Sequence, residues 1–112
     1  MSQRYNPYYN PEKLGLTMNE FNESGMCYEY NTLCFFLTGD GRIYSAQDSG
    51  CSCPIPFDGY KAETMEECVR QMSRIGSPEQ AMSELSSWND HNSYNQQNIN
   101  ELGEWIKNNL KA

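Results

Sequence analysis

The chain has 112 residues, of which 38% are hydrophobic, and fifteen acidic against eight basic side chains give it a net charge of −7. This length suits one domain with a thin core, and the acidic excess disfavours binding to nucleic acid or to an anionic lipid surface. No apolar run is long enough to span a membrane, and the first six residues lack the hydrophobic region of a secretory signal. We therefore expect a single cytoplasmic domain over residues 1–112.

The first fifteen residues form a turn-rich arm, because two Asn-Pro steps lie in residues 6–11. Asn10 is typical of a helix N-cap, Pro11 suits the first helical position, and Gly15 suits the position after a helix ends. These signals predict a helix of at most one turn within the arm, residues 1–15.

Three segments of the next part of the chain have the composition of β-strands. They cover residues 16–22, 26–37 and 42–47, and the Asp40-Gly41 step between the last two is a strong hairpin signal. The sequence therefore predicts a three-stranded antiparallel meander over about residues 16–47. Such a sheet leaves one apolar face to be covered by helices.

Apolar residues then recur at helical spacing, which predicts two or three C-terminal helices, over about 64–75, 78–88 and 97–110. Thr64 opens the first with a capping-box pattern, and Ser77 precedes Pro78 at the start of the second. The asparagine-rich stretch 89–97 is a polar loop whose composition favours mobility. The predicted fold class is α+β.

Between the strands and the helices lies an extended loop, residues 48–57, which contains Cys51 and Cys53. These cysteines are small buried side chains in one interpretation, with Phe57 filling the core beside them. In a second they bind zinc, which requires further ligands such as His91. In a third they form a strained, redox-active pair.

No spacing identifies a reaction, because nucleophile, phosphate-loop and zinc-protease motifs are all missing from the sequence. Asp48 together with Cys51 or Cys53 is the one constellation that would be tested as an active site. The odd number of cysteines favours reduced thiols. We expect a protein that is not an enzyme and has no cofactor, with zinc as the alternative.

Three motifs occur together: Tyr-Asn-Pro-Glu-Lys-Leu-Gly-Leu at 9–16, Tyr-Glu-Tyr at 28–30 and Asp-Ser-Gly-Cys-Ser-Cys-Pro-Ile-Pro-Phe at 48–57. With them, residues 5–60 of the chain resemble a family of small proteins of unknown function found in actinobacteriophages and their hosts. The resemblance implies a phage setting and brings no catalytic residues. The resemblance makes the loop at 48–57 a stronger functional candidate than its local sequence features alone would.

The main hypothesis is a non-enzymatic phage protein that binds a host protein, for host takeover or inhibition of a defence system. A basic surface on the partner would suit the negative charge of the chain. One alternative is a thiol or zinc site at the cysteine pair, and another is a minor virion or assembly component. The sequence predicts no oligomeric state. The candidate binding residues are the tyrosines of the arm and residues of the loop: Tyr8, Tyr9, Asp48, Ser49, Cys51, Cys53 and Phe57.

Overall fold

The computed structural model describes residues 3–24, 29–51, 57–88 and 96–111. The strands are β1 (Leu16–Ser24), β2 (Glu29–Thr38), β3 (Ile43–Cys51) and β4 (Ser73–Ile75). The helices are α1 (Met65–Val69), α2 (Pro78–Trp88) and α3 (Gln96–Asn109), with two short 3-10 helices, η1 (Pro11–Leu14) and η2 (Asp58–Tyr60).

The sheet is antiparallel, with the strand order β1-β2-β3-β4. Its first three strands are the predicted meander, and the α+β class is confirmed. The β2–β3 turn closes with a hydrogen bond from the Thr38 N–H to the Arg42 carbonyl, at 2.9 Å. Gly41 has a φ of 88° in this turn, a conformation that favours glycine.

The sheet has a fourth strand, which the sequence analysis placed inside a helix over 64–75. That helix, α1, ends at Val69, and residues 73–75 turn back to pair with β3. The pairing buries Ile75 completely and gives the edge of β3 hydrogen-bond partners. The spacing of Met65, Cys68, Val69 and Met72 identified the side of the segment that packs on the core, but not where the helix stops.

β3 is also longer than predicted. The strand was expected to end at residue 47, but it continues to Cys51, where it pairs with Glu29 at the start of β2. The extension follows from the length of β2, whose ten residues offer backbone partners along the whole of β3. Four of the ten residues of the predicted loop at 48–57 are therefore strand, and residues 52–56 lie outside the described part of the chain.

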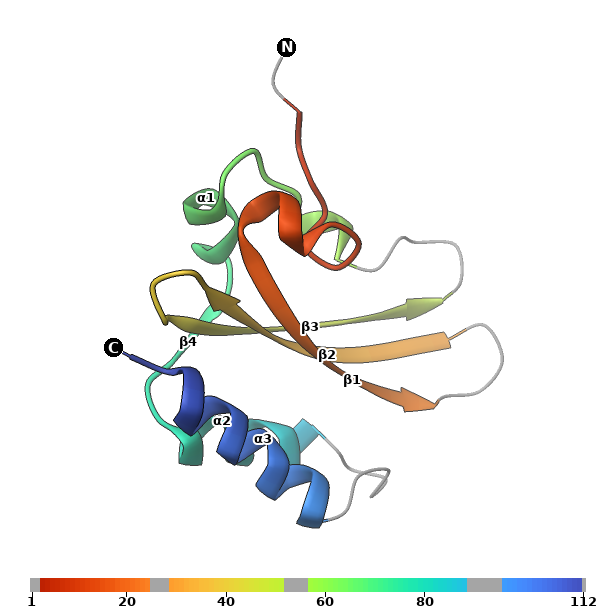
Figure 1. Cartoon of the computed structure of the whole chain (residues 1–112). Coiled ribbons are helices and arrows are strands. Elements are labelled where there is room, and N and C mark those ends of the chain that lie inside the picture. Colours follow the sequence, from red (N-terminus) through yellow and green to blue (C-terminus); the bar gives the residue numbers. More distant parts are fainter. Residues whose placement is uncertain (1–2, 25–28, 52–56, 89–95, 112) are drawn as a thin grey trace.

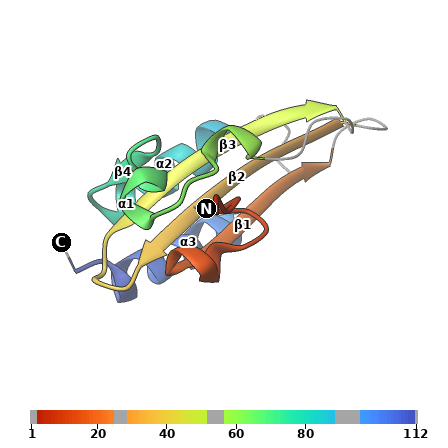
Figure 2. The same cartoon turned by 90° about the horizontal axis from the view of Figure 1, so that it is seen from above.

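The sheet lies between two layers (Figures 1 and 2). The N-terminal arm, η2 and α1 cover one face, and α2 and α3 cover the other. Each face has its own buried cluster, and the alternation of side chains along a strand assigns neighbouring residues to different clusters. In β2, for example, Phe36 belongs to the first cluster and Phe35 to the second.

Thr64 and Ser77 cap the N-termini of α1 and α2, as the sequence predicts. The Thr64 hydroxyl accepts the Glu67 N–H at 3.2 Å, and the Ser77 hydroxyl accepts the Gln80 N–H at 3.2 Å. Helices α2 and α3 fall close to the predicted ranges. Of the predicted loop at 89–97, residues 89–95 lie outside the described chain, and 96 and 97 belong to α3.

Two contacts attach the ends of the chain to its middle. Tyr5 and Ala62 exchange backbone hydrogen bonds of 2.7 and 3.1 Å, which hold the arm beside η2. The Lys111 N–H donates to the Gly41 carbonyl at 2.9 Å, and a Cβ added at Gly41 would lie 2.6 Å from Lys111 Cβ. The hairpin turn and the end of α3 thus fit together only because residue 41 is glycine.

Candidate functional site

Several of the predicted binding residues meet on one face of the sheet. The ring of Tyr8 stacks on that of Phe57 with centroids 5.4 Å apart, and Tyr9 contacts Tyr8 edge to face. Asp48 accepts the Ser49 N–H at 3.0 Å and the Phe57 N–H at 2.7 Å. The carboxylate of Asp48 therefore ties both ends of the predicted loop together.

Phe57 is a structural residue of this cluster. Its side chain is fully buried, and its φ of 62° is unusual for a residue with a Cβ. The bond from its N–H to Asp48 fixes this conformation, which aims the ring between Tyr8, Phe36 and Tyr60. The burial agrees with the interpretation in which Phe57 fills the core.

The two tyrosines of the arm differ in their exposure. Tyr8 is partly buried, and its hydroxyl donates to the Glu20 carboxylate. Burial and this hydrogen bond raise the pKa of Tyr8 above its ordinary value. Tyr9 is 55% exposed. Among the described residues, it is the large hydrophobic side chain that lies open to solvent. Of the pair, Tyr9 is the one that a partner can reach.

The cysteine pair is not placed by the structure. Cys53 and His91 lie outside the described residues, and Cys51 is described only as the backbone of the last residue of β3. Among the residues whose side chains are placed, no group of three or more His, Cys, Asp or Glu could hold a metal ion. The thiol and zinc interpretations of Cys51 and Cys53 stay predictions.

β3 presents an open edge beyond the end of β4. Residues of an antiparallel strand turn their backbone groups alternately to one neighbour and the other. Thr38 and Arg42 pair directly at the turn. By alternation from this pair, the backbone N–H and C=O groups of Tyr44, Ala46 and Asp48 point to β2. The backbone groups of Gln47 and Ser49 point to the opposite side. No strand lies beside them there in the described chain, because the pairing of β4 with β3 stops at Ser45 and Ser73.

The outward backbone groups of this edge have few partners. Within the described chain, no hydrogen bond to the outward N–H and C=O of Gln47 is present, whereas Asp48 accepts the N–H of Ser49. Unpaired strand edges are sites where another extended segment adds to a sheet. The edge at Gln47 is therefore a point at which the protein can pair with another backbone.

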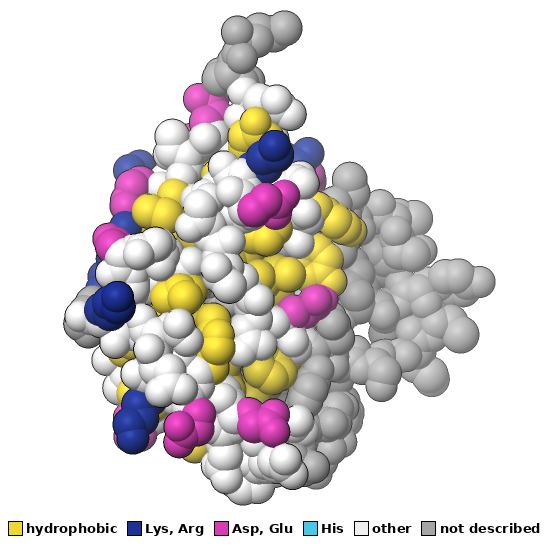
Figure 3. Space-filling view, in the orientation of Figure 1, with side chains coloured by type: hydrophobic (Ala, Val, Ile, Leu, Met, Phe, Trp, Pro, Cys, Tyr) yellow, Lys and Arg dark blue, Asp and Glu magenta, His cyan; other side chains and the backbone are white. Residues whose placement is uncertain are grey.

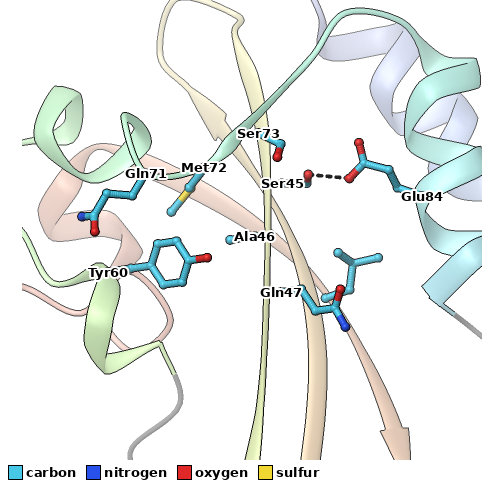
Figure 4. Close-up of a pocket in the computed structure, with 9 residues that line it drawn as sticks. Ser45, Ala46, Gln47, Tyr60, Gln71, Met72, Ser73 and Glu84 are labelled. Atoms are coloured by element: carbon cyan, nitrogen blue, oxygen red, sulfur yellow. Dashed lines mark hydrogen bonds between the residues drawn. The ribbon is translucent and has the colours of Figure 1, made fainter.

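A cavity of about 260 Å³ lies at this edge, and we call it the edge groove. Figure 4 shows Tyr60, Gln71 and Met72 on one side of β3 and Glu84 on the other. The two layers that cover the sheet thus extend past β3 and form two walls, with the open edge between them. The edge groove is lined by residues of β2, β3, η2, β4, α2 and the segment after α1: Leu33, Ser45, Ala46, Gln47, Tyr60, Gln71, Met72, Ser73 and Glu84.

A hydrogen-bonded pair connects β3 to α2 at the end of the groove. The buried Ser45 hydroxyl donates to Glu84 Oε1 at 2.6 Å, and Gln80 Nε2 donates to Glu84 Oε2 at 3.3 Å. Serine nucleophiles of enzymes are activated by a histidine or lysine base. Among the described residues that line the groove, neither type is present. The pair positions the Glu84 carboxylate at the groove.

A second cavity, of about 490 Å³, lies between α2 and α3. It is lined by residues of both helices, which include Met82, Gly103 and Lys107. Gly103 allows the close packing here, since a Cβ added to it would lie 2.7 Å from the Met82 sulfur. The cavity lies between two helices and away from the strand edge that forms the edge groove.

The opposite edge of the sheet, at β1, looks different. Figure 3 shows the side of the molecule on which β1 lies, where hydrophobic side chains gather in the middle and charged side chains surround them. The arm lies beside the start of this strand, and Tyr8 bonds Glu20 on it. A charged side chain on an edge strand discourages pairing with another strand.

The edge groove is not predictable from the sequence. Ser45 and Gln47 were assigned to a strand, and Glu84 to a helix, but nothing in the sequence brings residues 39 positions apart together. The free edge also depends on where β4 ends, and β4 was itself missed. A short Ser-Arg-Ile stretch between two turns was the signal that could have indicated a strand.

No helix of the described residues is both long and apolar enough to cross a membrane. The comparisons with curated proteins and with solved structures found no match. A family model, DUF7574, matches residues 5–111, which is nearly the whole chain. The chain therefore belongs to the family described as a domain of unknown function, DUF7574.

Proposed function

We propose that the chain is a non-enzymatic binding protein that captures an extended segment of another protein along the open edge of β3. The observation that carries this proposal is the unpaired, outward N–H and C=O of Gln47, at the floor of a groove with a wall on each side. In strand addition, backbone hydrogen bonds supply affinity and flanking pockets supply specificity. The edge groove offers both.

The size of the groove also favours a peptide over a small molecule. Its volume of about 260 Å³ is below the ~300–1,000 Å³ of typical ligand pockets. A peptide strand would occupy the groove with one or two side chains while the rest of its backbone follows β3. The main partner is therefore a protein.

The setting of this activity comes from the sequence motifs. Their resemblance to a family found in actinobacteriophages supports a host protein as the partner, bound in the host cytoplasm for host takeover or inhibition of a defence system. The net charge of −7 suits a partner with a basic surface.

Selection from a random heptapeptide library, with the wild-type protein as bait, tests the proposal. We expect binders whose affinity falls about tenfold when the peptide is N-methylated at alternate positions, because each such methyl group removes a hydrogen bond to the strand edge. Fluorescence anisotropy measures the affinities. The same loss is expected for the Gln47→Pro variant, whose proline lacks the N–H, and not for Gln47→Ala, which keeps it.

Circular dichroism and the urea midpoint of each variant establish that it folds. N-methylated peptides test the same hydrogen bonds without altering the protein, so an unfolded Gln47→Pro variant would leave the test intact. A library that yields no binder, or binders that tolerate N-methylation at every position, would overturn strand addition.

A further inference from the structure

The edge groove has Glu84 on one wall and, on the other, the Tyr60 ring and the Met72 thioether beside the Gln71 amide. We infer that the captured segment places a lysine or arginine against Glu84 and an apolar side chain, at the neighbouring position, against Tyr60 and Met72. This inference rests on the proposed function and adds the chemistry of the partner. It follows from the charge of Glu84, the alternation of side chains along a strand, and the charge of the whole chain.

Glu84 is a carboxylate without a cationic partner in the described structure. It is half-buried, its two oxygens accept hydrogen bonds from the neutral side chains of Ser45 and Gln80, and the ion pairs present involve other residues. The bond from Ser45 fixes one oxygen at the groove and limits the rotation of the side chain. An arriving ammonium or guanidinium group would form a charge-assisted hydrogen bond with a carboxylate that is already positioned.

The opposite wall carries the Tyr60 ring and the Met72 thioether near the strand, with the exposed amide of Gln71 beside them. Tyr60 and Met72 are partly buried and pack on the first hydrophobic cluster, with the ring of Tyr60 tilted against Phe57 at 5.6 Å. Burial and the nearby Asp48 raise the pKa of Tyr60, so its ring stays neutral at physiological pH. A neutral ring and a thioether favour an apolar side chain.

The geometry of a strand places these two contacts on adjacent residues. Gln47 lies on the α2 side of the sheet with Ser45, and Ala46 lies on the other side with Tyr44. A residue paired with Gln47 would point its side chain to the Glu84 wall, and the next residue would point to Tyr60 and Met72. The captured segment therefore contains a basic and an apolar residue in succession.

A second copy of the chain fits the groove less well. Pairing two β3 edges would bring together two chains that each carry a net charge of −7, and would leave each Glu84 facing an acidic surface. Charge complementarity instead selects a basic segment of a different protein. A dimer that Gln47→Pro abolishes, measured by light scattering after gel filtration, would overturn the assignment of a different partner.

The heptapeptides selected on the wild-type protein test the inference. We expect a lysine or arginine enriched beside an apolar residue, and an affinity that falls about tenfold or more in the Glu84→Gln variant. Replacing the basic residue of the peptide by methionine should remove the difference between wild type and Glu84→Gln, as a double-mutant cycle requires. Glu104→Gln, the same change at an exposed position of α3, is the matched control and should leave affinity unchanged.

The outcomes separate the inference from the proposed function. Peptides that show the alternating N-methylation pattern but no basic residue, or equal affinity for wild type and Glu84→Gln, would overturn the inference and leave strand addition standing. Loss of the N-methylation pattern would overturn both.

Discussion

At the scale of single residues, burial decides which cysteines can react. Cys34 and Cys68 have no exposed surface. Burial raises the pKa of the Cys34 thiol above its ordinary value, and burial with a smaller effect of Glu67 raises that of Cys68 to about 11. At pH 8 the Cys68 thiol therefore stays protonated and is a poor nucleophile. Neither cysteine is a candidate for redox chemistry in the folded protein.

We predict that Ellman's reagent at pH 8 labels at most three of the five cysteines of the folded protein quickly, and all five in urea. The three are the cysteines other than Cys34 and Cys68. Rapid reaction of four or five thiols under native conditions would contradict the burial described here.

The same measurement tests the alternative function at Cys51 and Cys53. If these cysteines bind zinc, a chelator should increase the number of reactive thiols and release metal, which an atomic-absorption measurement would detect. The Cys51→Ser/Cys53→Ser variant is the control, because it should release no zinc.

At the scale of single elements, β4 shows that pairing with a neighbouring strand can override a helical spacing of apolar residues. Ser73 and Ile75 lie opposite Ser45 and Ile43, whose backbone groups point to β4, so both pair with β3. Arg74 lies between them and turns its N–H away, while its guanidinium stacks 5.5 Å above the Tyr44 ring. Only alternate positions of β4 therefore need an N–H.

This alternation gives a test of strand against helix. We predict that Arg74→Pro lowers the free energy of unfolding by no more than about 1 kcal/mol beyond Arg74→Ala, because an outward position of an edge strand tolerates proline. Ser73→Pro should cost clearly more than Ser73→Ala, since it removes a ladder hydrogen bond. Urea unfolding measures both differences. In a helix both prolines would cost ~3 kcal/mol or more, so equal large losses would contradict the strand.

The sequence predicts features that depend on neighbouring residues, and it does not predict features that depend on residues far apart in the chain. The hairpin at Asp40-Gly41 and the caps at Thr64 and Ser77 depend on neighbours within a few residues, and the structure confirms them. β4 depends on Ile75 reaching Ile43, which local spacing does not encode. The edge groove depends on both that pairing and the Ser45–Glu84 bond, so it could not be predicted.

At the scale of the whole molecule, the sheet separates two hydrophobic cores. Val69 lies in the cluster under α1 and the arm, and Ile106 lies in the cluster under α2 and α3. Both are buried, and they belong to the clusters on opposite faces of the sheet. Packing defects in one core should therefore leave the other unaffected.

We predict that Val69→Ala lowers the free energy of unfolding by about 1–3 kcal/mol and Ile106→Val by about 0.5–1.5 kcal/mol, and that their effects add within ~0.5 kcal/mol. Urea denaturation of the two single variants and the double variant measures the sum. Leu102→Ala with Ile106→Val, both in one cluster, is the positive control for coupling. A coupling above ~1 kcal/mol between Val69 and Ile106 would contradict two independent cores.

The bond between Lys111 and Gly41 has a consequence for the order in which the protein is assembled during synthesis. The meander and its hairpin turn are synthesised before α3, the helix that helps to cover their second face and docks on the turn. Until then the apolar side chains of that face, such as Phe35 and Ile43, have no cover, and exposed sheets of this kind are prone to aggregate. Until α3 has been synthesised, a nascent chain therefore carries an apolar sheet face that can associate with other chains.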